Sequence, residues 1–241
     1  MIELHSTGFH VRSEYLDADL AAVNEVVTRD AYHLSELASL WRRSPPLHVI
    51  DVGAHIGSFA LFFHRLGCER RIPHACVAIE ANPDNLDVLS ANVSEWGHVV
   101  HGACYYGPGE LSLFNTVHPA NGNRTTCTSS STVAVEESAL KPDYADPHHA
   151  SHWHDRRPLP KVTLEQVMGD RGWDRIDLLK LDCEGAEFSI LENCDLSRVN
   201  LIVGEWHDRE RWEKLVNDRL FDWRWRRLGE GKNSGIFWLS R

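Results

Sequence analysis

The stretch that decides the fold is Leu47-His-Val-Ile-Asp-Val-Gly-Ala-His-Ile-Gly-Ser-Phe59. Its first six residues form an apolar run with two polar interruptions, which is typical of a buried strand. Gly53 and Gly57 permit a sharp turn and a close approach of ligand to backbone, and an amphipathic helix pattern starts at Ser58. Strand, turn and helix in this order predict the first βα unit of a doubly wound, mostly parallel sheet.

The residues of this turn narrow the class of ligand. A dinucleotide fingerprint reads G-x-G-x-x-G, but His55 stands where its second glycine would be, and Gly57 is not followed by the lysine of a phosphate-binding loop. Asp51, at the end of the strand, would repel phosphate and suits a cation. A sulfonium cofactor with an amino-acid tail fits this charge. We therefore expect five residues around the amino-acid end of such a cofactor: Asp51, Gly53, Ala54, His55 and Gly57.

The second and third strands are expected to continue this site. The apolar run 75–81 carries Glu80 near its end, where an acidic side chain is placed to accept hydrogen bonds from two ribose hydroxyls. A helix over 83–96 follows, with Pro83 in its first turn, and then a strand over 98–103. We expect the nucleoside part of the cofactor to lie against Glu80, Ala81, Asn82 and Ala103.

Acidic residues also follow two later strands. The strand over 177–182 ends in Asp182, with Glu184 in the next turn, and the strand over 199–203 is followed by Glu205 and His207. Because ligands of open α/β sheets lie at the carboxyl ends of the strands, Asp182 is expected both to contact the cofactor and to face the substrate. We predict that these four residues carry the chemistry.

Three roles stay open for His207. As a neutral imidazole it is a candidate general base, oriented by Glu205. Alternatively Asp182, Glu205 and His207 together bind Mg²⁺ or another divalent cation, which would lower the pKa of a substrate hydroxyl. A structural histidine with satisfied hydrogen bonds is the third interpretation.

Four blocks in this order resemble one known family. They are D-V-G-A-H-I-G-S-F at 51–59, A-I-E-A-N-P at 78–83, L-L-K-L-D-C-E-G-A-E at 178–187 and V-G-E-W-H at 203–207. Together they resemble the FkbM family of S-adenosylmethionine-dependent methyltransferases. The resemblance implies a class I methyltransferase fold and O-methylation of a small molecule or a sugar, as in secondary-metabolite biosynthesis. His55 departs from the asparagine usual in the family, which leaves its side-chain contact to the cofactor open.

We therefore expect an α/β chain with the class I, Rossmann-like methyltransferase fold over 47–241, closed by an antiparallel hairpin over 222–240. A helical rhythm over 14–43 predicts an N-terminal helical extension, 1–46. A substrate-loop insertion is expected around 116–160. Within it, Arg124 is available for an anion, and the His-rich stretch 147–155 fits a metal site, a substrate-facing loop or a solvated loop.

The composition limits the kinds of molecule that the protein is expected to bind. The 241 residues carry a formal net charge of −10, which argues against a nucleic-acid surface. No segment has the length of a membrane span, no signal-peptide pattern is present, and the six cysteines form no CxxC pair. We expect a cytoplasmic protein with reduced thiols that acts on a small-molecule hydroxyl acceptor. No pattern specifies an oligomeric state.

Two competing functions follow from the same fold. One is a nucleotide-dependent oxidoreductase, against which the absent G-x-G-x-x-G stands. The other is a non-catalytic binding or scaffold protein, against which the acids at the strand ends stand.

Overall fold

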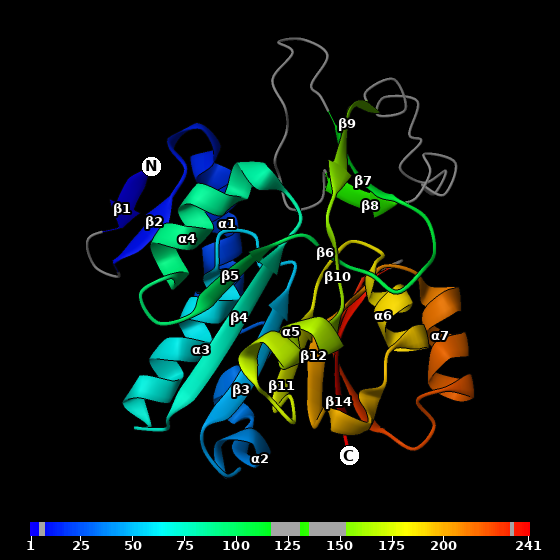
Figure 1. The fold of residues 1–241 in the computed structure, drawn as a ribbon. Coiled ribbons are helices and arrows are strands. Elements are labelled where there is room, and N and C mark those ends of the chain that lie inside the picture. The colour runs from blue at the N-terminus through cyan, green and yellow to red at the C-terminus, as the bar shows by residue number, and fades with distance from the viewer. Residues whose placement is uncertain (5–7, 117–130, 135–152, 232–233) are drawn as a thin grey trace.

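The computed structural model describes residues 1–4, 8–116, 131–134, 153–231 and 234–241 (Figure 1). Its centre is a seven-stranded sheet in which β3, β4, β5, β11 and β12 are parallel. The strand β14 runs antiparallel to both β12 and β13, so the predicted closing hairpin is confirmed. In sheet order the strands are β13 (Arg224–Glu230), β14 (Gly235–Ser240), β12 (Leu201–Trp206), β11 (Leu178–Leu181), β3 (Leu47–Val52), β4 (His74–Glu80) and β5 (His98–His101).

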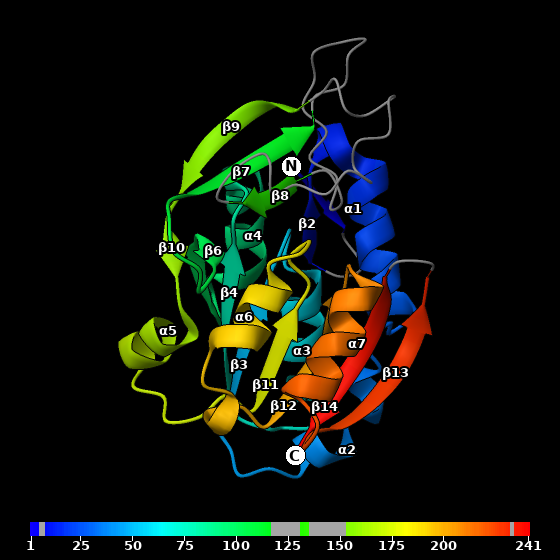
Figure 2. The same ribbon diagram turned by 90° about the vertical axis from the view of Figure 1, so that its right-hand side faces the viewer.

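Helices cover both faces of this sheet, as a doubly wound fold requires. Figure 2 shows α6 and α7 on one side of the strands and α3 on the other. Alternate residues of one strand enter different cores: Val49 packs among the residues of α3 and α4, whereas Ile50 packs among those of α5, α6 and α7. The helices are α3 (Ser58–Glu69), α4 (Leu86–Val93), α5 (Leu164–Arg171), α6 (Glu187–Asn193) and α7 (Arg209–Asp218).

The N-terminal segment is less helical than its apolar rhythm predicts. Strands β1 (Ile2–Leu4) and β2 (Phe9–Val11) pair antiparallel, and α1 (Leu16–Val23) continues into a π-helical turn over Asn24–Thr28. The helix ends where Asp30 adopts a left-handed backbone, with a φ of 48°, and the Asp30 carboxylate accepts hydrogen bonds from the amides of Leu34 and Ser35. A 3₁₀ turn over Leu34–Glu36 and α2 (Ala38–Trp41) follow. The segment nevertheless supplies core residues: Tyr32, Leu34, Leu37 and Leu40 are buried against α3 and the sheet.

A second sheet lies beyond the main one. It consists of β7 (Leu111–Thr116), β8 (Ser131–Ala134) and β9 (Trp153–Leu159), all antiparallel. These strands therefore form a sheet separate from the main one. The strand predicted over 98–103 divides into β5 and β6 (Ala103–Cys104), and β6 pairs with β10 (Lys161–Val162). Arg124 and residues 147–152 of the His-rich stretch lie outside the described residues.

Across the described ranges, no helix is both long enough and apolar enough to traverse a membrane. The helix predicted over 83–96 is shorter than expected, with a 3₁₀ turn at Pro83–Asn85 followed by α4.

Candidate active site

The turn after β3 approaches the end of β11 so closely that it requires glycine. A Cβ on Gly53 would lie 1.8 Å from the carbonyl oxygen of Asp182, and Gly53 has a φ of +74°. His55 also adopts a positive φ, of 51°. Its backbone amide donates to the Glu80 carboxylate at 2.8 Å. The turn therefore joins the carboxyl ends of three strands, β3, β4 and β11.

A pocket that opens to solvent lies over this turn. The pocket brings together most of the residues predicted from the sequence to contact a cofactor. Those that line it are Gly53, His55, Glu80, Ala81, Asn82, Ala103 and Asp182, with Glu184 beside them.

Three residues predicted to surround the cofactor do not line this pocket: Asp51, Ala54 and Gly57. Asp51 is completely buried, and its Oδ1 lies 3.2 Å from the ammonium of Lys180. Burial raises the pKa of Asp51, and the Lys180 charge opposes that rise. Asp51 therefore supports the turn from below, and its negative charge is neutralised within the protein rather than by a ligand.

Lys180 is the residue that sequence reasoning missed. Besides Asp51, its Nζ lies 3.7 Å from Asp182 Oδ2 and donates to the Gly53 carbonyl at 2.7 Å. Burial lowers the pKa of Lys180, but the two carboxylates raise it further, so the ammonium stays charged. A lysine inside the apolar run of β11 was the available signal, because a charge at such a position needs a partner.

Glu80 is held with its carboxylate facing the pocket. One oxygen accepts from the backbone amide of His55 at 2.8 Å, and the other accepts from the backbone amide of Asn82 at 2.8 Å and from Asn85 Nδ2 at 3.1 Å. Burial raises the pKa of Glu80, and these donors oppose the rise. A carboxylate offers about four acceptor positions. Glu80 therefore keeps acceptor capacity for a hydroxyl group.

His55 is fixed by two residues of the N-terminal segment. Arg12 Nη2 lies 2.8 Å from His55 Nε2, and Arg12 also pairs with the buried Asp19. Burial, followed by the Arg12 charge, lowers the pKa of His55 to about 4. The neutral ring accepts from Arg12 at Nε2 and therefore carries its proton on Nδ1, which is buried and has no hydrogen-bond partner among the described residues.

Asp182 is the second pocket residue, after His55, that the N-terminal segment contacts. The hydroxyl of Tyr32, 150 residues away in sequence, donates to Asp182 Oδ2 at 3.0 Å. Burial raises the pKa of Asp182, but the charges of Lys180 and His207 more than offset it, so the pKa is lowered.

Where β11 and β12 end, His207 lies among three carboxylates. Its Nδ1 is 3.1 Å from Glu187 Oε1, and its Nε2 is 3.6 Å from both Glu184 Oε2 and Glu205 Oε2. Burial lowers the pKa of His207, but the hydrogen bonds and charges of these acids raise it to about 12. An imidazolium has no lone pair to accept a proton. The charge on the ring disfavours the general-base role, one of the three left open for His207. Sequence alone did not place Glu187 beside this ring.

The predicted metal set is also brought together. One ligand atom each from Asp182, Glu205 and His207 lies within 4.8 Å of the other two. In the structure, His207 is paired with the carboxylates of Glu184, Glu187 and Glu205.

Comparison with known proteins decides the class of this site. A family model described as "Methyltransferase FkbM domain" matches residues 51–225. The chain belongs to the FkbM methyltransferase family. It is a methyltransferase that depends on S-adenosylmethionine, which favours neither the oxidoreductase nor the scaffold alternative.

Several individual proteins are similar to this chain. Methyltransferase sdnD of Sordaria araneosa is 30% identical over 219 residues, which cover 82% of this chain and 80% of the relative. AMB antimetabolite synthetase AmbE of Pseudomonas aeruginosa is 28% identical over 206 residues, but these span only 9% of that protein. The crystal structure of methyltransferase FkbM from Methylobacillus flagellatus covers 87% of this chain and 47% of that chain, with 14% identity and a TM-score of 0.46.

Proposed function

We propose that this FkbM methyltransferase methylates a hydroxyl oxygen of a small molecule or a sugar in secondary-metabolite biosynthesis. The observation that carries the proposal is the group of carboxylates where β11 and β12 end: Asp182 lines the pocket, and Glu205 lies close behind it. Methylation of a neutral hydroxyl requires removal of a proton, whereas a thioether or a deprotonated carboxylate requires none. A cluster of anionic acceptors beside the pocket fits a hydroxyl.

The pocket fits the cofactor that the family uses. In the proposal, Glu80 accepts hydrogen bonds from the ribose, and Ala81, Asn82 and Ala103 border the adenine. Gly53 lets the amino-acid end lie against the turn, and the unpartnered Nδ1–H of His55 is a donor at the same end. Bound S-adenosylmethionine supplies an electrophilic methyl group on a positively charged sulfur.

The protein's contribution is then alignment and proton removal. Bound cofactor would supply the methyl group to the substrate oxygen and leave as S-adenosylhomocysteine, and Glu205, with Asp182 beside it, would accept the proton that the hydroxyl loses. Lys180 and Tyr32 hold Asp182 in place. His207 holds Glu184 and Glu205 as their counter-charge.

A divalent cation is a second version of this mechanism, favoured by the closeness of Asp182, Glu205 and His207. Carboxylate oxygens are ligands that Mg²⁺ prefers. Held there, the ion would lower the pKa of a substrate hydroxyl, and His207 would have to release its proton to bind it.

The segment 1–46 is part of this proposed catalytic unit, because Arg12 and Tyr32 extend from it to His55 and Asp182. We propose that this segment covers the site, which lies in the domain 47–241. The cytoplasmic location remains a prediction.

Methyl transfer from labelled S-adenosylmethionine to a panel of alcohols, glycosides, amines and carboxylic acids tests the proposal. We expect a methyl ether as product, identified by mass spectrometry. Glu205→Gln should reduce turnover at least ~100-fold with unchanged affinity for S-adenosylhomocysteine, and the exposed Glu210→Gln serves as the matched control. Loss of activity in a chelator, restored by Mg²⁺, would select the cation version. Methylation of nitrogen or carboxylate alone, or full turnover by Glu205→Gln, would refute the proposal.

A further inference from the structure

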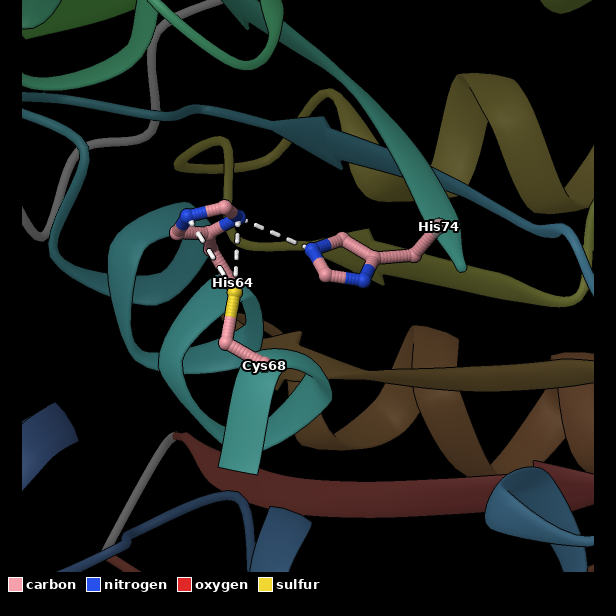
Figure 3. Close-up of side chains that lie close together, drawn as sticks. All are labelled: His64, Cys68 and His74. Carbon is pink, nitrogen blue, oxygen red and sulfur yellow. Dashed lines mark hydrogen bonds between the residues drawn. The ribbon is translucent and has the colours of Figure 1, made fainter. Parts of the chain in front are cut away.

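A second cluster of ligand-type side chains lies far from the pocket. His64 and Cys68 are one turn apart on α3, and His74 is the first residue of β4 (Figure 3). His64 Nδ1 lies 2.8 Å from His74 Nε2. Cys68 Sγ lies 3.6 Å from His64 Nε2 and 4.0 Å from His64 Nδ1. One ligand atom from each of the three residues is within 4.8 Å of the others.

The two rings are held in this arrangement by their surroundings. The carbonyl oxygen of Ile72 lies 2.7 Å from His74 Nδ1, so it accepts the ring proton and leaves the lone pair on Nε2, the atom that faces His64. Such a hydrogen bond to a backbone carbonyl is the usual support of a metal-binding histidine. Trp96 stacks on His64, with ring centroids 4.1 Å apart and an interplanar angle of 15°.

Gly67 explains how His74 comes so close to the helix. A Cβ at this position would lie 2.5 Å from His74 Nδ1, so only glycine lets the ring lie against α3 beside Cys68. Glycine is unfavourable inside a helix. Its presence at position 67 is consistent with a requirement for the position of the His74 ring.

We propose that His64, Cys68 and His74 bind one zinc ion, with water as the fourth ligand. Imidazole nitrogen and thiolate sulfur are the ligands that zinc prefers. Ordinary zinc bond lengths and tetrahedral angles place two nitrogens about 3.4 Å apart, and nitrogen and sulfur about 3.6 Å apart. The separations of His64 Nδ1 from His74 Nε2 and from Cys68 Sγ differ from these by about half an ångström, and Cys68 and His74 offer ligand atoms within 4.8 Å of each other. Cys68 binds as the thiolate, and its proton passes to solvent.

The site is separate from the methyltransferase pocket. His74 starts β4 and Glu80 ends it, and a seven-residue strand is about 20 Å long. Figure 1 shows that β4 begins beside the end of α3 and runs to the opposite end of the sheet's strands. The zinc would therefore tie the end of α3 to the start of β4, across the connection over 70–73.

Cobalt substitution tests the proposal directly. Metal-free protein titrated with Co²⁺ should develop a thiolate-to-cobalt charge-transfer band, and zinc should displace it. The band should be absent from Cys68→Ser and present in the control Cys183→Ser, which removes the thiol next to the carboxylate cluster of the active site. By chelator competition, wild type should hold one zinc more than Cys68→Ser, and His74→Asn should weaken that zinc at least ~100-fold.

Melting temperatures of the metal-free proteins check that each variant folds. Because Cys68 is exposed, Cys68→Ser should leave the melting temperature of the metal-free protein unchanged. If His74→Asn fails to fold, the Cys68→Ser comparison alone decides. Absence of the band from wild type, its loss in Cys183→Ser instead of Cys68→Ser, or equal zinc content in wild type and Cys68→Ser would overturn the proposal.

Discussion

Replacement of Lys180 by methionine tests the buried ion pair beneath the turn. The Lys180 ammonium lies 3.2 Å from Asp51, which has no exposed surface, and it donates to the Gly53 carbonyl at 2.7 Å. Methionine fills similar space but leaves Asp51 as an uncompensated buried charge, which costs about 3–5 kcal/mol. For a chain of this size we expect a melting temperature lower by about 6–20 °C.

A double-mutant cycle isolates the pair from other effects. Asp51→Asn removes the buried charge, so the double variant should be more stable than the sum of the two single changes predicts, by an interaction energy of roughly 1–3 kcal/mol. Denaturant titration of all four proteins measures this energy. The exposed Lys214→Met, which removes the Asp218 pair on α7, is the matched control and should leave the unfolding midpoint unchanged. Additive effects, or a Lys180→Met variant as stable as Lys214→Met, would refute the reasoning.

Three further predictions concern the pocket. Glu80→Gln removes a charged acceptor worth about 1.5–3 kcal/mol, so calorimetry should show S-adenosylhomocysteine binding roughly 10–100-fold more weakly, and equal affinity would contradict the ribose contact. The pKa of His55 is about 4 in the folded protein, against an ordinary value of 6.5, so the unfolded chain binds a proton at a higher pH than the folded one. The free energy of unfolding should therefore fall by up to about 3 kcal/mol as the pH drops from 6.5 to 4. Urea titrations should show a smaller fall in His55→Asn, and an unchanged pH dependence in this variant would refute the prediction. Tyr32→Phe removes the hydrogen bond to Asp182 and should lower turnover about 5–10-fold, whereas wild-type rates would show that the bond is not used.

Most of the central sheet was predictable because its strands are short apolar runs that end in acids or glycine. The sequence placed Glu80, Asp182 and Glu205 at strand ends, and the fold brings these ends to one edge. It could not assign a partner to Asp51, since that needs the strand order. In the structure Lys180 of β11 is directly opposite Asp51 of β3, which lies 129 residues earlier in the sequence. An acid predicted to attract a ligand is therefore neutralised by a neighbouring strand.

The N-terminal segment shows a different limit. Its apolar rhythm predicted a helical extension, and Tyr32 of this segment is buried. The helix ends early because Asp30 and His33 adopt left-handed backbone conformations, with φ values of 48° and 50°, which periodicity does not reveal. The contacts of Arg12 with His55 and of Tyr32 with Asp182 follow from this chain path, so no local pattern indicated them.

The partners of His207 show why a residue can be located from the sequence while its charge cannot. Glu205 was predicted to orient His207, and the structure places Glu205 Oε2 3.6 Å from His207 Nε2. Glu187, from the first turn of α6, decides the charge on the ring, and its distance from His207 depends on packing between two separate elements.

The central claim is that the pocket at the ends of β3, β4 and β11 binds S-adenosylmethionine. Calorimetric titration with S-adenosylhomocysteine tests it most directly, on wild type and on Glu80→Ala, with Glu110→Ala as an exposed control. We predict one binding site in wild type and in the control, and a loss of affinity in Glu80→Ala. Absence of binding to wild type, or equal affinity in all three proteins, would contradict the account.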